Sequence, residues 1–205
     1  MRVDEGFRRE IIAAVQAVEK TSAAEVVVTV VPRSAAHWDV TLGAALAATL
    51  LMQAVVALFF DDTGALHVAL DSAVLAALVV GLVRGLPALE RLLLPRRAAA
   101  RRVEAGAESA FCRQGIFRTH AHVGVLVYLS LLERRAVLLP DDGVARALPA
   151  EALASLRAQA AAIFAGPDPR AALLSLLDHL RRLGAQHLPA SGDKVNELPD
   201  EPVTG

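Results

Sequence analysis

Cysteine is scarce in this 205-residue sequence, which contains Cys112 and no other. A single cysteine excludes an intramolecular disulfide and any metal site built from several cysteines of one chain. We therefore expect a reducing compartment. Because no Cys-His-acid pattern surrounds Cys112, we interpret it as a buried helical thiol rather than a nucleophile.

Recognisable catalytic signatures and an excess of one charge are also lacking. The sequence has no G-x-S-x-G, no P-loop and no dinucleotide fingerprint, which disfavours the enzyme classes that carry them. Its 21 basic and 22 acidic residues leave a net charge of -1, so no global field favours nucleic acid. The first 15 residues lack the apolar run of a secretory signal peptide, and we expect any membrane insertion to use internal segments.

Hydrophobic residues, by contrast, make up 55% of the chain and are concentrated between residues 40 and 94. Residues 40–60 contain no charge, and 21 residues of helix span roughly 30 Å, the thickness of a hydrocarbon core. The only polar side chains there are Thr41, Thr49 and Gln53, too few for the polar stripe of a soluble helix. This segment is predicted to cross a membrane.

A second apolar stretch covers residues 66–83 and follows an acidic turn at residues 61–64. A single crossing would place the basic region that follows this stretch on the far side of the membrane. A second crossing is the simplest way to bring that region back to the side on which the chain began. Asp71 lies about one helical turn inside this stretch, where we expect its carboxylate to be solvated at the end of the hairpin. The alternative is that Asp71 marks a transport subunit.

Arginines cluster after the second apolar stretch, whereas the connecting turn carries only acids. This asymmetry predicts that the basic flank and both termini are cytoplasmic. Membrane lipid is the expected partner of these cations, and nucleic acid is not. Residues 86–94, bounded by prolines, are predicted to continue as an interfacial helix. The arginines are Arg84, Arg91, Arg96, Arg97, Arg101 and Arg102.

The remaining segments predict a small α/β domain that the hairpin interrupts. Helical periodicity marks residues 4–20 and 98–114, and β-branched runs mark strands at 25–31, 123–130 and 135–139. Two further helices begin at Pro149 and after an Asp168 cap. The predicted fold class is a small mixed sheet flanked by helices and interrupted by a two-helix transmembrane hairpin. The predicted parts are residues 1–36, the first part of the α/β domain; 37–95, the transmembrane hairpin with an interfacial helix; 96–189, the second part of the α/β domain; and 190–205, a disordered tail.

Few residues of the α/β domain suggest chemistry. Asp141 and Asp142, with Glu133 nearby in sequence, could hold a divalent cation such as Ca²⁺ or Mg²⁺, although an Asp-Asp-Gly sequence also suits a plain turn in which glycine takes a positive φ. His120 and His122 are two residues apart and would share one side of a strand, where they could ligate a metal. The alternative is a pair of polar residues at a strand entrance.

Three segments resemble the TPM-domain family, named for a thylakoid lumen protein, a photosystem II repair protein and a receptor-modulating membrane protein. EVVVTVV is similar to the family's first strand, HVGVLVYLSLLERRAVLLPDDGV to its central hairpin, and NELPD to the ending of bacterial members with membrane segments. The resemblance implies a small α/β sandwich, often membrane-tethered, with roles in complex maintenance and, in some members, phosphatase activity or divalent-metal binding. The acid-rich loop of phosphatase-like members is reduced here to Asp141 and Asp142.

Together these observations predict a membrane-anchored, TPM-like binding or scaffolding module of the bacterial inner membrane, without enzymatic activity. Other membrane proteins are its expected partners. A metal-dependent phosphatase acting on phosphomonoesters is the alternative, with Asp141 and Asp142 as metal ligands.

Overall fold

The computed structural model describes residues 3–60, 64–119, 121–190 and 197–204. The chain divides into two compact units. We call residues 1–35 and 100–205 the sheet unit, and residues 36–99 the hairpin unit.

The sheet unit contains a four-stranded mixed sheet of order β3-β2-β1-β4. β1 runs parallel to β2 over seven residue pairs, and β2 continues antiparallel into β3. The predicted fold class, a small mixed sheet flanked by helices, is confirmed. The elements are α1 (Glu5–Thr21), β1 (Glu25–Val31), α5 (Arg96–Arg113), η1 (Ile116–Arg118), β2 (Gly124–Ser130), β3 (Arg135–Pro140), α6 (Asp142–Ala147), α7 (Ala150–Ala162), α8 (Pro169–His187) and β4 (Val203–Thr204).

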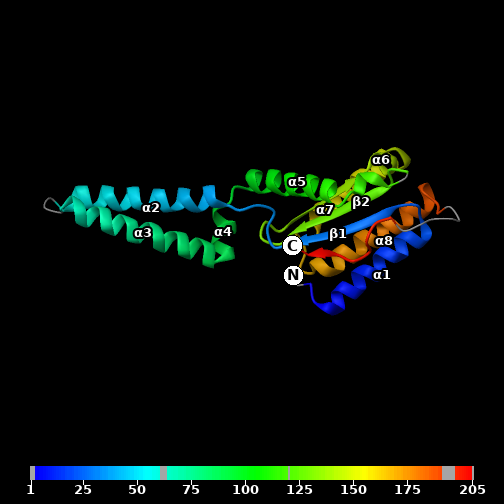
Figure 1. Cartoon of the computed structure of the whole chain (residues 1–205), viewed down its shortest axis with the longest axis horizontal. Helices are drawn as coiled ribbons and strands as arrows, with labels where there is room; N and C mark the ends of the chain where they lie inside the picture. The colour runs from blue at the N-terminus through cyan, green and yellow to red at the C-terminus, as the bar shows by residue number, and fades with distance from the viewer. Residues whose placement is uncertain (1–2, 61–63, 120, 191–196, 205) are drawn as a thin grey trace. The chain divides into compact units, whose positions relative to one another are not determined.

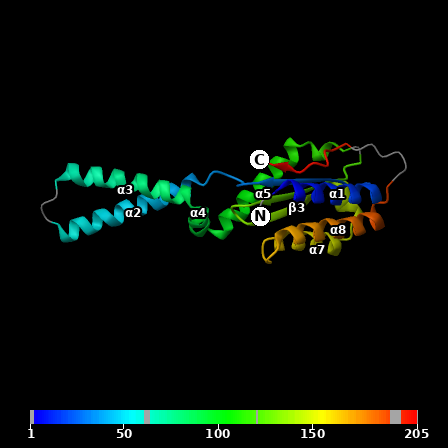
Figure 2. The ribbon, with the colours of Figure 1, turned by 90° about the horizontal axis from the view of Figure 1, so that it is seen from below.

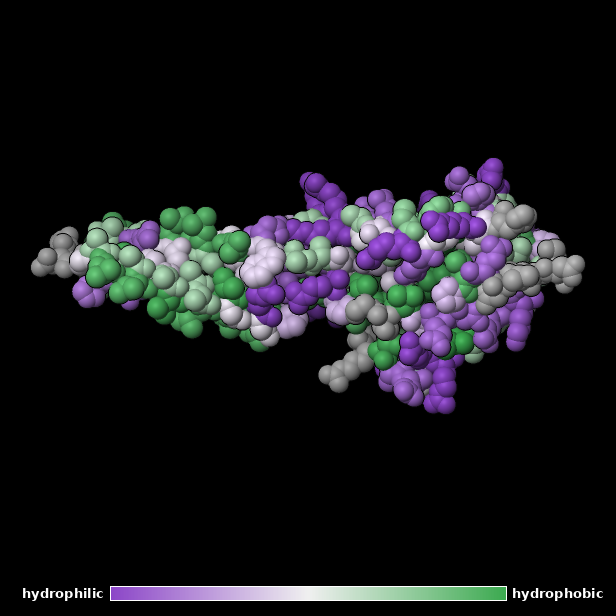
Figure 3. Space-filling model, in the orientation of Figure 1, coloured by the Kyte–Doolittle hydropathy of each residue, from purple (hydrophilic) through white to green (hydrophobic). Residues whose placement is uncertain are grey.

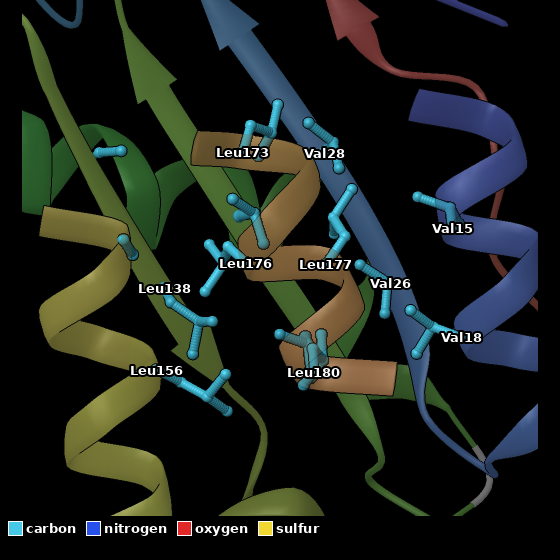
Figure 4. Packing of buried hydrophobic residues seen from close by; sticks show 14 of the residues in the cluster. Val15, Val18, Val26, Val28, Leu138, Leu156, Leu173, Leu176, Leu177 and Leu180 are labelled. Atoms are coloured by element: carbon cyan, nitrogen blue, oxygen red, sulfur yellow. The ribbon is translucent and has the colours of Figure 1, made fainter. Parts of the chain in front are cut away.

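The two central strands are buried on both faces, which explains their continuous runs of apolar residues. Because side chains alternate along a strand, Val26 and Val28 face one side of β1 while Val27 faces the other. The first side packs against α1, α7 and α8 in the larger core, where Leu176 and Leu177 of α8 lie beneath the sheet (Figure 4). The second side is covered by α5, on the opposite face of the sheet (Figure 1).

Both long helices on the larger core face begin at an aspartate cap. Asp168 accepts hydrogen bonds from two backbone N–H groups of α8, which confirms the predicted cap. Asp4 caps α1 by accepting from the N–H of Phe7 at 2.9 Å. That hydrogen bond, with the nearby Arg170 guanidinium, lowers the pKa of the Asp4 carboxyl.

α5 corrects the prediction for Cys112, which is exposed rather than buried. The buried face of this helix carries Val103, Ala107 and Ala110, spaced four and three residues apart. Cys112 follows Ala110 by two residues and is therefore rotated roughly 200° around the helix, onto the opposite side.

The end of the chain also differs from the prediction of a disordered tail. Residues 191–196 lie outside the described part, but residues 197–204 have defined positions. Leu198 is 9% exposed within the smaller apolar cluster, and Val203–Thr204 form β4 against Thr29 and Val30 of β1. The sequence of this segment has no apolar period from which its ordered position could be predicted. Its order comes from contacts with the sheet rather than from local propensity.

The hairpin unit consists of α2 (Trp38–Phe59), α3 (Ala65–Gly85) and the short α4 (Pro87–Leu93). α2 and α3 are both long and apolar enough to span a membrane, and their most apolar windows are only 11% and 6% buried. Hydrophobic side chains therefore cover this unit, whereas the sheet unit has a largely hydrophilic surface (Figure 3). The two helices lie side by side in both ribbon views (Figures 1 and 2), and Gln53 of α2 donates to Ser72 of α3 at 3.2 Å.

Candidate functional site

The acidic residues after β3 begin a helix. Asp141 is the N-cap of α6, and its Oδ1 accepts from the backbone N–H of Asp142 at 2.8 Å. Its Oδ2 lies 3.2 Å from Nδ1 of His122. Asp141 is buried and Asp142 exposed, so the two adjacent carboxylates occupy different surroundings. Asp141 is used to order the start of a helix and the preceding loop.

Gly143 is required at this position for space, not for a left-handed backbone. Its φ is not positive, contrary to the prediction of a plain glycine turn. A Cβ on Gly143 would lie 2.4 Å from the carbonyl oxygen of Ala121, and its N–H donates to the carbonyl of His122 at 2.8 Å. The sequence pattern D-D-G therefore marks the close approach of α6 to the loop before β2.

The predicted histidine pair is tested only in part. His120 lies outside the described residues. His122 is exposed and sits in the loop before β2 with a left-handed φ of 54°, so it does not belong to a strand as the two-residue spacing assumed.

Glu133 is remote from Asp141 despite being near it in sequence. It follows the far end of β2, and six residues of antiparallel strand place it roughly 20 Å from the acidic residues after β3. There the buried carboxylate accepts from the hydroxyl of Ser130 and from the backbone N–H of Ser34 at 3.1 Å. These contacts join the ends of β1 and β2, a role that sequence reasoning did not assign to Ser34 or Ser130.

Among the described residues, no three His, Cys, Asp or Glu side chains are grouped closely enough to hold a metal ion. The Ca²⁺ or Mg²⁺ site at Asp141 and Asp142 stays a prediction.

Aromatic and charged side chains meet at the base of the hairpin unit, where α2 begins and α3 ends. The guanidinium of Arg84 lies 4.0 Å from the centre of the Trp38 ring, a cation-π contact between the two helices. Tryptophan and arginine are typical of helix ends at a membrane surface.

A buried pair lies at the same base. Nδ1 of His37, the N-cap of α2, is 3.0 Å from Oε1 of Glu90 in α4, and both side chains are at most 2% exposed. The hydroxyl of Thr41 donates to the His37 carbonyl at 3.0 Å. Sequence reasoning missed this pair because its members are 53 residues apart and neither belongs to a motif.

The sheet unit and hairpin have a structural relative. The similar chain is the NMR structure of BA42 protein from the psychrophilic bacterium Bizionia argentinensis. Its TM-score is 0.61 at 13% sequence identity, with 100% of this chain and 97% of that chain covered. No protein-family model matches the sequence, and no curated protein matches it. At this identity the likeness concerns the fold alone, and the resemblance to the TPM-domain family stays a prediction.

The outward faces of α2 and α3 form an exposed apolar surface. Leucines at Leu46, Leu50 and Leu78 are 55–65% exposed along the helices, between the polar base and the turn. Asp71, the residue predicted to be solvated at the hairpin end or to serve transport, is exposed on α3 in its second turn. The described part of α2 and α3 has no other charged residue between Asp39 and Arg84.

Proposed function

We propose that this protein is a bacterial inner-membrane protein anchored by α2 and α3, whose sheet unit serves as a cytoplasmic binding or scaffolding module of TPM-like type. The observation that carries the proposal is the exposure of apolar side chains around both long helices. Monomeric soluble proteins rarely expose apolar patches larger than a few hundred Å², so a surface of this kind needs lipid or protein around it.

The distribution of charge supports the orientation. Arg84, Arg91 and Arg96 are exposed at or just beyond the end of α3. Cations at this position favour the cytoplasmic side, and they are attracted to anionic headgroups. An even number of spans then places both parts of the sheet unit in the cytoplasm.

Binding rather than catalysis is supported by the use of the polar groups in the sheet unit. Asp141 caps a helix and Glu133 joins two strand ends, so the strongest acidic candidates already have structural partners. The proposed partners are membrane lipid and other membrane proteins.

Two experiments test the proposal. Protease added outside intact spheroplasts should leave residues 100–205 uncut, and the same protease should cut them in inverted vesicles. Crosslinking in native membranes followed by capture of the full chain should recover the same membrane protein in repeated preparations. A full chain that stays monomeric and folded in the aqueous fraction without detergent would refute the anchor, and capture of the bait alone would refute the scaffold.

The contact between His122 and Asp141 favours a second candidate, a metal-dependent phosphatase acting on phosphomonoesters. A divalent cation could be held there by the carboxylates of Asp141 and Asp142, where it would neutralise phosphate charge and activate water. Purified full chain should then hydrolyse a phosphomonoester with Mg²⁺ or Ca²⁺ present, and D141A/D142A should lose this turnover. Unchanged turnover in the double variant would exclude both carboxylates from the reaction.

A further inference from the structure

A groove opens at the base of the hairpin unit, along one side of α2. Its first wall is one face of the first two turns of this helix and consists of Asp39, Val40, Gly43 and Ala44. Its second wall lies where α4 ends and α5 begins and consists of Leu93, Pro95 and Ala98. The groove holds about 320 Å³, near the lower end of the range of roughly 300–1,000 Å³ found for small-molecule sites. We call it the base groove.

Gly43 keeps the base groove open. A Cβ built on this residue meets nothing within 4 Å, so no protein atom fills the space beside it. The neighbours of Gly43 in the first wall are small or apolar, Val40 and Ala44. A larger side chain at position 43 would therefore occupy the groove without displacing the rest of the hairpin unit.

The base groove lies at the depth of the lipid headgroups when α2 and α3 span a membrane. Gly43 is about 7.5 Å along α2 from Trp38, the first residue of the helix. The Trp38 ring stacks on the Arg84 guanidinium at this end, and such side chains are typical of the membrane surface. Lipid is therefore the molecule that surrounds both walls.

Charges around the second wall favour a lipid of negative charge. Glu90 of α4 is 2% exposed and adds no exposed negative charge. The first wall contributes the exposed carboxylate of Asp39. Three exposed arginines flank the residues of the second wall in sequence: Arg91, Arg96 and Arg97. Three cations against one aspartate leave an excess of two positive charges, which attracts an anion.

We propose that the base groove binds one anionic phospholipid, with an acyl chain between its two walls and the phosphate beside the exposed arginines. This inference rests on the proposed membrane anchor, and it names the class of lipid and the place where it is held. Lipid tails are as apolar as the groove, so chain contacts alone give little preference over the bilayer. The selectivity comes from the charge, and the groove fixes the position of the lipid.

Lipid retention by the full chain tests the proposal. The chain is purified in detergent and given equal amounts of dioleoyl phosphatidylglycerol, which is anionic, and dioleoyl phosphatidylethanolamine, which is zwitterionic. Native mass spectrometry then counts the lipids that stay bound. One phosphatidylglycerol should be retained with a preference of about twenty-five-fold, because each of two unbalanced cations favours an anionic lipid by about fivefold.

Two variants locate the bound lipid. R96Q/R97Q removes the excess of positive charge and should retain the two lipids about equally. G43L should bind phosphatidylglycerol at least about fivefold more weakly, because leucine takes the place of contacts to the acyl chain. Its matched control is G81L in α3. Gly81 also meets nothing within 4 Å and lies about 6 Å from the last residue of its helix, but it does not line the groove.

G81L should retain phosphatidylglycerol as the intact chain does. Equal retention by G43L and G81L would overturn the inference, and so would equal retention of the two lipids by the intact chain. If G43L does not fold, R96Q/R97Q decides the question, because it changes only exposed side chains, and an unchanged preference in it would overturn the inference. A dimer of the intact chain that G43L alone disperses would overturn it too, because a second copy would then fill the groove.

The inference and the membrane anchor fail in different ways. A chain that resists extraction from membranes but shows no preference for phosphatidylglycerol would lose the lipid site and keep the anchor. A chain that stays folded and monomeric without detergent would lose both, because the base groove would then face water.

Discussion

Replacing one leucine of α2 by arginine measures whether lipid surrounds this helix. Leu50 lies about 18 Å from the first residue of the 22-residue α2, close to the middle of a helix about 33 Å long. Leu42 lies only about 6 Å from the same end. Their exposed fractions are 55% and 56%, so the two sites differ in depth and hardly in exposure.

At the centre of a spanning helix, leucine favours insertion by roughly 0.5 kcal/mol and arginine opposes it by roughly 2.5 kcal/mol or more. L50R should therefore cost about 3 kcal/mol, which is about a hundredfold in the insertion equilibrium. L42R should cost much less, because an arginine near the helix end extends its guanidinium to the headgroups. Trp38 and Arg84 already occupy that end.

The insertion free energy can be read from residues 38–59 placed in a reporter membrane protein, as the fraction of chains that cross. The full-length variants supply a second readout, the fraction that resists alkaline carbonate extraction from membranes. Equal insertion of L50R and L42R would refute the assignment of α2 as a span. The same conclusion would follow if full-length L50R became a folded monomer in detergent-free buffer, since a soluble helix gains solubility from arginine at either site.

The remaining predictions concern the sheet unit. D141A should lower the free energy of unfolding by about 1 kcal/mol, because the N-cap of α6 is lost. D142A changes an exposed side chain and should lower it by less than about 0.5 kcal/mol. Urea denaturation in detergent measures both values, and equal losses would contradict the assignment of Asp141 as the cap. G143A should cost about 1–3 kcal/mol because its Cβ would meet a carbonyl oxygen at 2.4 Å, whereas G166A, with nothing within 4 Å, is the matched control and should be close to neutral in the same assay. Because the pKa of Asp4 is lowered in the folded state, its contribution to stability is present above its ordinary pKa and is lost as the pH falls below about 4 through the folded value. D4N should therefore reduce the dependence of the free energy of unfolding on pH in that acidic range. An unchanged pH profile would contradict this prediction.

Elements with a strong internal period could be predicted from the sequence. β1 was predicted at the residues where it occurs, because six β-branched residues follow Glu25 and end at Pro32, a pattern that suits a strand buried on both faces. The Asp168 cap of α8 was equally local, since Asp-Pro before an apolar period specifies a helix start.

Features that depend on distant contacts could not be predicted. β4 has two residues and exists because Thr29 and Val30 lie beside it. α6 has six residues and was interpreted as a turn, since so short a helix has too few positions to show a period. The His37–Glu90 pair joins the cap of α2 to α4 and leaves no trace in sequence spacing.

The candidate site was predictable only as a set of residue types. Asp141, Asp142 and Glu133 are close in sequence, yet antiparallel pairing of β2 and β3 separates Glu133 from the other two. Closeness in sequence therefore did not predict which of these acidic residues lie close together in the structure.

The order of strands has a consequence for synthesis on the ribosome. β1 lies between β2 and β4, and the codons for both of its neighbours are translated only after those for the entire hairpin. A nascent chain that has just emerged with β1 therefore carries a strand made mainly of valine whose two neighbouring strands are not yet translated. The next helix to leave the exit tunnel is the apolar α2. We expect a chaperone or the membrane surface to protect these segments at that moment, because β1 can pair with β2 only once translation has passed residue 130.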